Sequence, residues 1–305
     1  MVAAQNVFVK VAVDFDSFMS QAWSDHATDS HGVALRLTEH AFALLTNEAQ
    51  LVRLMNLVQH VHGEHLHEWA GGVACFDALT ASEFFVFEGE SGQTVRRCVA
   101  SFSLSAHADF NLTALTESDQ IRVQAMAAAN LAGVNPARGM RLLQAALDRA
   151  ANSSLPHTDT NAMHRALAVS GHNLAAALEE NASLTRDEAK LMLMASQASR
   201  VHRERAGTWL QVERAEYQLA TTHLKAGDVV QGEFHARECG RIVAENDAPA
   251  LERFFACEAL GRVMRAAKND AAYRIARGQA RAAFEGLEAG DKAWCEASLD
   301  KLLEG

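Results

Sequence analysis

Proline is scarce in this sequence of 305 residues, which contains only Pro136, Pro156 and Pro249. Because proline breaks the interior of a helix, its near absence permits long uninterrupted helices. Alanine and leucine dominate segments in which apolar residues recur every three or four positions, whereas strict alternation of apolar and polar residues is rare. The sequence therefore predicts an all-α protein.

Positively charged residues are also fewer than negatively charged ones. The chain has 28 Lys and Arg residues against 38 Asp and Glu residues, for a formal net charge of -10. Proteins that follow a nucleic-acid backbone neutralise its phosphates with clustered cations. The basic residues here never form a run of five or more, so we expect no nucleic acid partner.

Long apolar runs are missing as well, since no stretch approaches the roughly 18 residues that a membrane-spanning helix needs. The opening "MVAAQNVFVKVAVDFDSF" lacks a basic segment followed by an uninterrupted apolar one, which is the pattern of a secretory signal. The five cysteines are odd in number and never form a C-x-x-C pair, so neither a disulfide framework nor a zinc ribbon is indicated. We expect a cytoplasmic protein with no membrane partner.

Turn and cap residues interrupt the helical pattern at intervals of roughly 15 to 25 residues. The predicted breaks are Asp29-Ser30, Thr46-Asn47, 89–92, Asn135-Pro136, Leu155-Pro156, Gly227-Asp228, 247–249, Asn269-Asp270 and Gly290-Asp291. The segment "SEFFVFEGESG", residues 82–92, does not follow the rule. A short strand, a helix end and a contact surface are all compatible with its phenylalanines.

Three short segments recur along the second half of the chain: "ASQASR", "ARECGR" and "ARGQAR" end at Arg200, Arg241 and Arg281. Their arginines are thus about 40 positions apart, and each segment is preceded by a helix with a matching apolar pattern. A fixed period of this length predicts a repeated unit of two helices.

One repeat unit has a leucine, several small residues, a histidine at the aromatic position and a turn glycine at the spacing of a tetratricopeptide repeat: Leu219, Ala220, His223, Gly227, Gly232, Ala236 and Cys239. Residues 118–287 therefore resemble a degenerate, bacterial tetratricopeptide-like helical-repeat protein. The resemblance implies an α-α superhelix, or solenoid, of about six or seven antiparallel helix pairs, in which neighbouring pairs bury each other's apolar faces. We expect one continuous body over residues 1–305, with divergent helix pairs over 1–110 and a capping helix over 290–305.

Such a superhelix presents a concave inner surface. The repeat register places there a polar, partly basic set of expected binding residues: Asn173, Arg214, Tyr217, Gln218, Arg262 and Arg265. The arginines would form charge-assisted hydrogen bonds to a carboxylate-bearing peptide, and Tyr217 would be an aromatic anchor. No nucleophile elbow, P-loop or dinucleotide motif occurs.

We therefore expect a non-enzymatic adaptor or scaffold that binds a protein or peptide partner without a cofactor. A peptide-responsive regulatory sensor with the same fold is an alternative, because it differs mainly in its ligand. The phenylalanine-rich segment 84–87 is a candidate surface for homodimer formation.

The stretch "QHVHGEHLHEW", residues 59–69, raises a hypothesis of a different class. At about 100° per residue, His60, Glu64 and His67 share one helix face, while His62 and His65 lie with the apolar residues and are expected in the core. The first three are candidate ligands for zinc or a similar ion, in a metal-binding protein or metal-dependent enzyme. The other interpretation of the same residues is a solvated polar face where one helix turns into the next.

Overall fold

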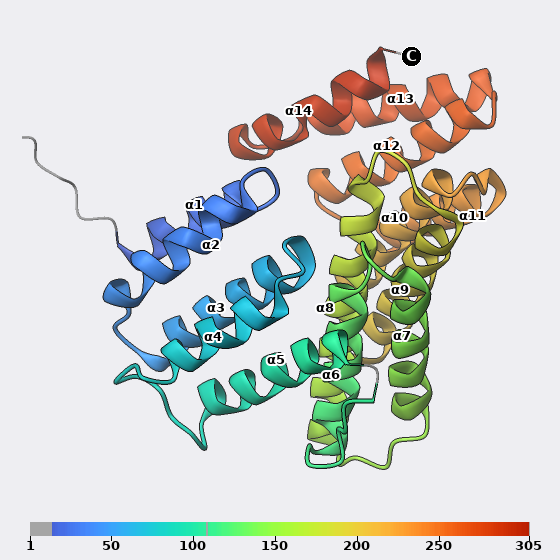
Figure 1. Ribbon diagram of the computed structural model, residues 1–305. Helices are drawn as coiled ribbons and strands as arrows, with labels where there is room; N and C mark the ends of the chain where they lie inside the picture. Colours follow the sequence, from blue (N-terminus) through green and yellow to red (C-terminus); the bar gives the residue numbers. More distant parts are fainter. Residues whose placement is uncertain (1–13, 108, 305) are drawn as a thin grey trace, which may run out of the picture. The chain divides into compact units, whose positions relative to one another are not determined.

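The computed structural model describes residues 14–107 and 109–304, without the side chain of His157 (Figure 1). Over those ranges all regular secondary structure is helical and no strand occurs. The predicted all-α class is therefore confirmed. Most of the segment considered as a targeting signal falls within positions 1–13, which lie outside the described part of the chain.

Two compact units make up the chain, with the division between Asn111 and Leu112. The first unit contains α1 (Phe15–Asp25), α2 (Ser30–Glu39), the short 3-10 helix η1 (Ala41–Leu44), α3 (Glu48–Val58), the π-helix η2 (Gln59–His65), α4 (Trp69–Leu79) and α5 (Glu90–Ala106). The second contains α6 (Glu117–Asn130), α7 (Pro136–Ala151), α8 (His157–Glu180), α9 (Arg186–Ala206), α10 (Trp209–Lys225), α11 (Val229–Glu245), α12 (Ala250–Ala266), α13 (Asp270–Glu285) and α14 (Ala289–Leu303). The single continuous body over residues 1–305 stays a prediction.

Many of the helices begin at a predicted break, whereas α9 and α10 begin after Thr185 and Thr208, where the sequence pattern predicts none. Five of the predicted break residues are N-caps whose side chains accept a hydrogen bond from a backbone N–H three residues further on: Asp29, Asn47, Asn135, Asp228 and Asn269. Such caps satisfy backbone donors that have no partner inside the helix. At the last break the N-cap is Glu288, two residues before the predicted Gly290.

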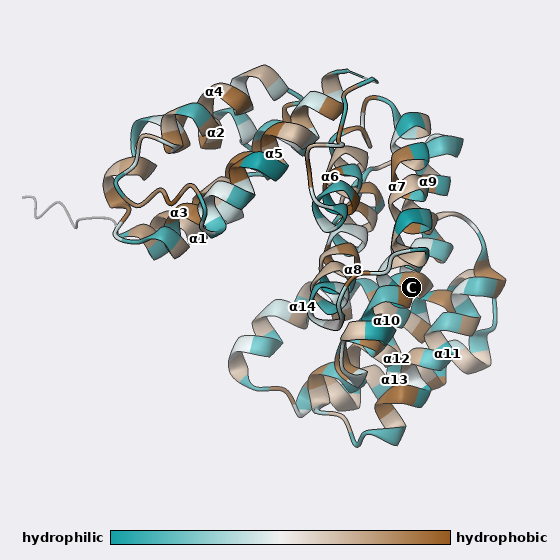
Figure 2. Cartoon of the chain, turned by 90° about the horizontal axis from the view of Figure 1, so that it is seen from below, coloured by the Kyte–Doolittle hydropathy of each residue, from teal (hydrophilic) through white to brown (hydrophobic). Residues whose placement is uncertain are grey.

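Helices of the second unit pack as consecutive hairpins. The pairs α6/α7, α8/α9, α10/α11 and α12/α13 are in contact, and the first helix of each pair also contacts the first helix of the next, through to α14 on α12. This packing is consistent with a helical solenoid, because each pair covers an apolar face of its neighbour. Each helix carries both hydrophobic and hydrophilic residues along its length (Figure 2).

Two glycines explain how these hairpins close. At Gly171 of α8, a Cβ atom would lie 2.6 Å from the carbonyl oxygen of Ala195 in α9, so only glycine allows the two backbones to approach this closely. Gly227 has φ +83°, a left-handed conformation in which it ends the turn after α10, immediately before the cap residue Asp228.

The core of the first unit lies between α3, α4 and α5. Phe76 and Phe102 are fully buried there, with ring centroids 5.8 Å apart, and Gly72 and Leu79 of α4 are also buried. Residues 84–87 form a loop rather than a strand, with Phe84 and Phe87 in turns, and Phe87 is 66% exposed. None of the helices over the described residues combines the length and apolar character required to cross a bilayer.

Candidate functional site

A cavity of about 450 Å³, which we call the inner cavity, lies in the second unit along the first helices of successive pairs. Its lining comes from α8, α10, α12 and α14, so it depends on the stacking of those helices. Three of the six residues predicted to bind a partner line it: Arg214, Tyr217 and Gln218. The predicted register is therefore consistent with the placement of these three side chains.

The other predicted binding residues lie elsewhere. Arg262 and Arg265 line a second cavity of about 480 Å³, which shares Ser298 with the inner cavity and is therefore adjacent to it. Asn173 is exposed on α8 and lines neither cavity. The predicted binding residues are thus divided between two neighbouring cavities and one exposed surface position.

The arginines of this region already have partners. Arg214 Nη2 lies 2.7 Å from Glu252 Oε1, and Arg262 Nη1 lies 3.6 Å from Glu258 Oε1. Arg265 donates to the carbonyl oxygen of Lys301, at 2.9 Å. The positive charge that the sequence suggests for the surface is therefore largely compensated from within the protein.

Carboxylates are the less expected component of the inner cavity. Glu213 is only 1% exposed, and burial raises the pKa of its carboxyl to about 7. It accepts a hydrogen bond from the Cys239 thiol at 3.0 Å. Burial also raises the pKa of Glu179, whose carboxylate accepts a hydrogen bond from the Thr221 hydroxyl at 3.0 Å.

Three aromatic rings form an apolar wall beside these carboxylates. The ring centroids of Tyr217 and Phe255 are 5.5 Å apart, and those of Phe255 and Trp294 are 5.1 Å apart, both in edge-on geometry. Trp294 is 66% exposed, whereas the Tyr217 hydroxyl donates to Glu258 Oε2 at 3.1 Å. Rings next to carboxylates are a suitable environment for a cationic group, since both attract positive charge.

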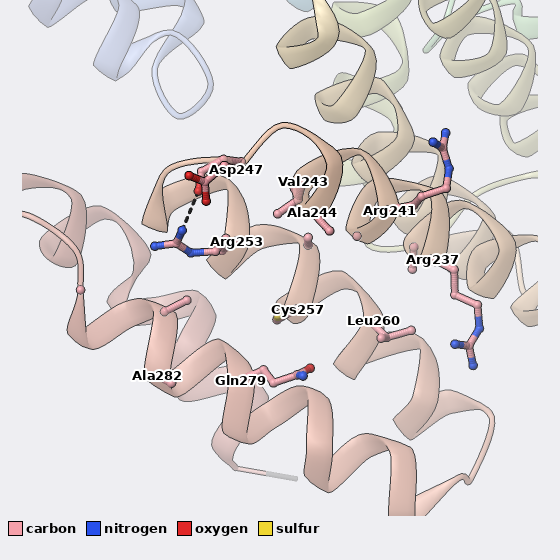
Figure 3. A pocket seen from close by; sticks show the side chains of 16 residues that line it. Arg237, Arg241, Val243, Ala244, Asp247, Arg253, Cys257, Leu260, Gln279 and Ala282 are labelled. Carbon is pink, nitrogen blue, oxygen red and sulfur yellow. Dashed lines mark hydrogen bonds between the residues drawn. The ribbon is translucent and has the colours of Figure 1, made fainter.

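A larger cavity, of about 750 Å³, lies between α11, α12 and α13 (Figure 3). Much of its lining is alanine and glycine, and three arginines, Arg237, Arg241 and Arg253, contribute to it. Arg237 and Arg241 pair with glutamates of their own helix, and Arg253 donates to the carbonyl of Ala248. Its three arginines are therefore engaged, and its small side chains offer little for directional recognition.

In the first unit, the histidine-rich stretch forms a compact cluster with a histidine from the end of α1. His60 Nε2 and His65 Nε2 lie 3.1 Å apart, and the ring of His26 is 4.8 Å from that of His60 and 5.0 Å from that of His65, between centroids. Glu64 Oε2 lies 3.0 Å from His60 Nδ1. Burial, followed by the neighbouring histidines, lowers the pKa of His65 to about 4.

This cluster differs from the predicted group His60, Glu64 and His67. His60 and Glu64 are together as expected, but the three ligand atoms that converge belong to His26, His60 and His65. His62 is buried, as predicted, whereas the expectation that His65 lies in the core is wrong, since it is partly exposed beside His60.

The reason is the π-helix η2, in which Leu66 N–H bonds to the carbonyl of Val61 five residues earlier. In an α-helix, His60 and His65 would be about 140° apart around the axis. The wider π-helical turn brings residues i and i+5 onto one face instead. His26 is 34 positions from His60 in the sequence, and only tertiary packing joins it to the cluster.

Comparison with protein-family models and with curated proteins identifies no match for this chain. The tetratricopeptide-like identity therefore stays a prediction. The fold supports this prediction through four residues of the tetratricopeptide-like repeat, which are each at most 1% exposed: Leu219, Ala220, Ala236 and Cys239.

Proposed function

We propose that the second unit is a protein- or peptide-binding module and that its inner cavity receives a cationic group of the partner, such as a lysine or arginine side chain. The observation that carries this proposal is the pairing of excess carboxylate with three aromatic rings in one hollow. Glu179, Glu213 and Glu252 line it, and Arg214 is the one arginine among the described residues of its lining.

The charge balance supports a cationic ligand. Arg214 is engaged with Glu252, while the contacts of Glu213 and Glu179 are hydrogen bonds from a thiol and a hydroxyl. Nearby cations, Arg214 for Glu213 and Arg262 and Lys225 for Glu179, lower the carboxyl pKa values less than burial raises them. A buried carboxylate whose charge is incompletely compensated is costly. A bound ammonium or guanidinium would reduce that cost, and it would gain further from the ring faces.

A carboxylate-bearing peptide, the ligand that the arginines first suggested, is less compatible with this hollow. It would have to compete with Glu252 for Arg214 and with Glu258 for Arg262. It would also approach carboxylates that are already buried, and like charges in such a site repel strongly. The stacked hairpins fit this function because they bring four helices to one surface, and we propose that they continue as a tetratricopeptide-like superhelix.

The test is selection of peptides from a random display library by the whole chain at pH 8. We expect enrichment of lysine and arginine over the starting library. An enriched, fluorescently labelled peptide is then titrated with variants, and Trp294→Ala and Glu179→Gln should each weaken binding about tenfold, which corresponds to about 1–2 kcal/mol.

Matched controls lie on the outer helix α11. Phe234 is 55% exposed and Glu233 pairs with Arg237, so Phe234→Ala and Glu233→Gln change similar chemistry away from the inner cavity. These variants should bind like the unmodified protein. Enrichment of acidic peptides, or equal losses in cavity and control variants, would contradict the proposal.

A further inference from the structure

We infer that the first unit contains a site for a divalent transition-metal ion, with Zn²⁺ as the first expected occupant, formed by His26, His60 and His65. The three side chains each offer one ring nitrogen, and these atoms all lie within 4.8 Å of one another. His60 and His65 come from η2, whereas His26 is the C-cap of α1. The inference does not depend on the inner cavity, which is in the other unit.

The spacing of the nitrogens suits a tetrahedral ion. Zn²⁺ binds imidazole nitrogen at about 2.0–2.1 Å, so two ligands of a tetrahedral site are about 3.3 Å apart. His60 Nε2 and His65 Nε2 lie 3.1 Å apart, close to that value. His26 is the third member of the set, since its ring is 4.8 Å from that of His60 and 5.0 Å from that of His65, between centroids.

Hydrogen bonds at the opposite side of two rings fix the donor atoms. Glu64 Oε2 lies 3.0 Å from His60 Nδ1, and the carbonyl oxygen of Trp23 lies 2.5 Å from His26 Nδ1. Both oxygens are acceptors, so each Nδ1 carries the hydrogen and each Nε2 carries the lone pair that a metal needs. Metal-bound histidines in proteins typically have a carboxylate or carbonyl partner of this kind.

The π-helix is a second, independent feature of the site. A π-helix of this length is rare, and π-helical turns are frequently found at functional sites. Here the altered turn has an identifiable consequence, because it places His65 beside His60 rather than in the core. Gly63, which is buried in η2, accepts a hydrogen bond from Trp69 Nε1 through its carbonyl, at 3.3 Å.

The ligand set defines the class of ion. Three imidazoles favour zinc, copper, nickel or cobalt, whereas Mg²⁺ and Ca²⁺ prefer oxygen ligands. Three protein ligands also leave a fourth position of a tetrahedral ion for water or another small molecule. The ring of Trp23, 41% exposed, is 5.1 Å from that of His60 and contributes an aromatic boundary on that side.

Metal binding is tested on the whole chain, purified without a histidine tag and stripped with a chelator. Titration with ZnCl₂, followed by calorimetry and elemental analysis after gel filtration, should give about one Zn²⁺ per chain. His60→Ala and His65→Ala should weaken binding at least about 100-fold, and Glu64→Ala about 10- to 100-fold because His60 loses its partner. His31→Ala, in an exposed position on α2, is the matched control and should bind as before.

A measurement on the unmodified protein does not depend on whether the variants fold. Zn²⁺ should protect His26, His60 and His65 from diethyl pyrocarbonate, with the modified positions mapped by mass spectrometry, while His31 stays reactive. Absence of stoichiometric Zn²⁺, retention of Zn²⁺ by a folded His60→Ala/His65→Ala variant, or protection at other histidines only would overturn the inference.

Discussion

Replacement of Glu213 by glutamine measures the electrostatic cost of the carboxylate in the inner cavity. The side chain is 1% exposed, and burial raises the pKa of its carboxyl from the ordinary value of 4.5 to about 7. The thiol of Cys239 and the charge of Arg214 lower this pKa, and Glu252 raises it, but burial is the dominant cause. The folded protein therefore keeps a proton on Glu213 at pH values where the unfolded chain has released it.

The magnitude follows from the two pKa values. The interval from 4.5 to about 7, at about 1.4 kcal/mol per pKa unit, corresponds to about 3 kcal/mol. Because the pKa is raised by folding, this contribution to stability is fully present below pH 4.5 and is lost as the pH rises to 7. Glutamine is neutral throughout and can still accept the thiol hydrogen of Cys239. Glu213→Gln should therefore be more stable than the unmodified protein by about 2–3 kcal/mol at pH 8 and differ little at pH 4.5.

Urea unfolding at pH 4.5 and pH 8, followed by far-UV circular dichroism, measures this difference. Glu216 is the matched control, since it is 5% exposed and lies on the same helix. Burial alone would raise its pKa, but hydrogen bonds from His235 and Arg200 outweigh burial and lower it. Glu216→Gln should thus destabilise the protein at pH 8. If the effect of Glu213→Gln on stability does not change between the two pH values, the electrostatic argument fails.

Three further predictions concern the second unit. Burial lowers the pKa of His202 to about 4, so its contribution to stability is present above pH 6.5 and is lost as the pH falls to 4. Between pH 6.5 and pH 4, the free energy of unfolding measured with urea should fall less in His202→Asn than in the unmodified protein, by up to about 3 kcal/mol. An equal fall in both proteins would contradict the assignment. Gly171→Ala places a methyl group 2.6 Å from the Ala195 carbonyl oxygen and should cost about 1–3 kcal/mol in thermal unfolding. Gly240→Ala meets no atom of the described residues within 4 Å and should stabilise α11 by about 0.5–1 kcal/mol, so similar shifts in both variants would refute the packing argument.

Local signals in the sequence account for most of the helix boundaries. Residues such as Asp29 and Asn47 cap helices through their own backbone neighbours, so the information is contained within four positions. Gly227 is a turn for the same local reason, because its left-handed backbone favours glycine over other residues. In η2 the backbone is a π-helix, so a calculation that assumes the α-helical step of about 100° per residue assigns His65 to the wrong face.

The charge of the inner cavity could be predicted only in part. The sequence shows arginines at inner positions, but it does not show that Glu252 meets Arg214, 38 positions away, or that Glu258 meets Tyr217, 41 positions away. Those partners are the reason that the ligand we propose for the cavity is a cation rather than an anion. The repeat period indicates which helices stack, yet it does not fix which side chains face one another.

The sequence by itself determined the all-α class and many of the helix boundaries, because periodicity, caps and turn glycines act over a few neighbouring residues. Tertiary structure alone decided that His26 joins His60 and His65, and that carboxylates compensate the arginines of the inner cavity. Those outcomes depend on contacts between residues that are far apart in the chain. The energies of these contacts are set by the packing of whole helices and by burial.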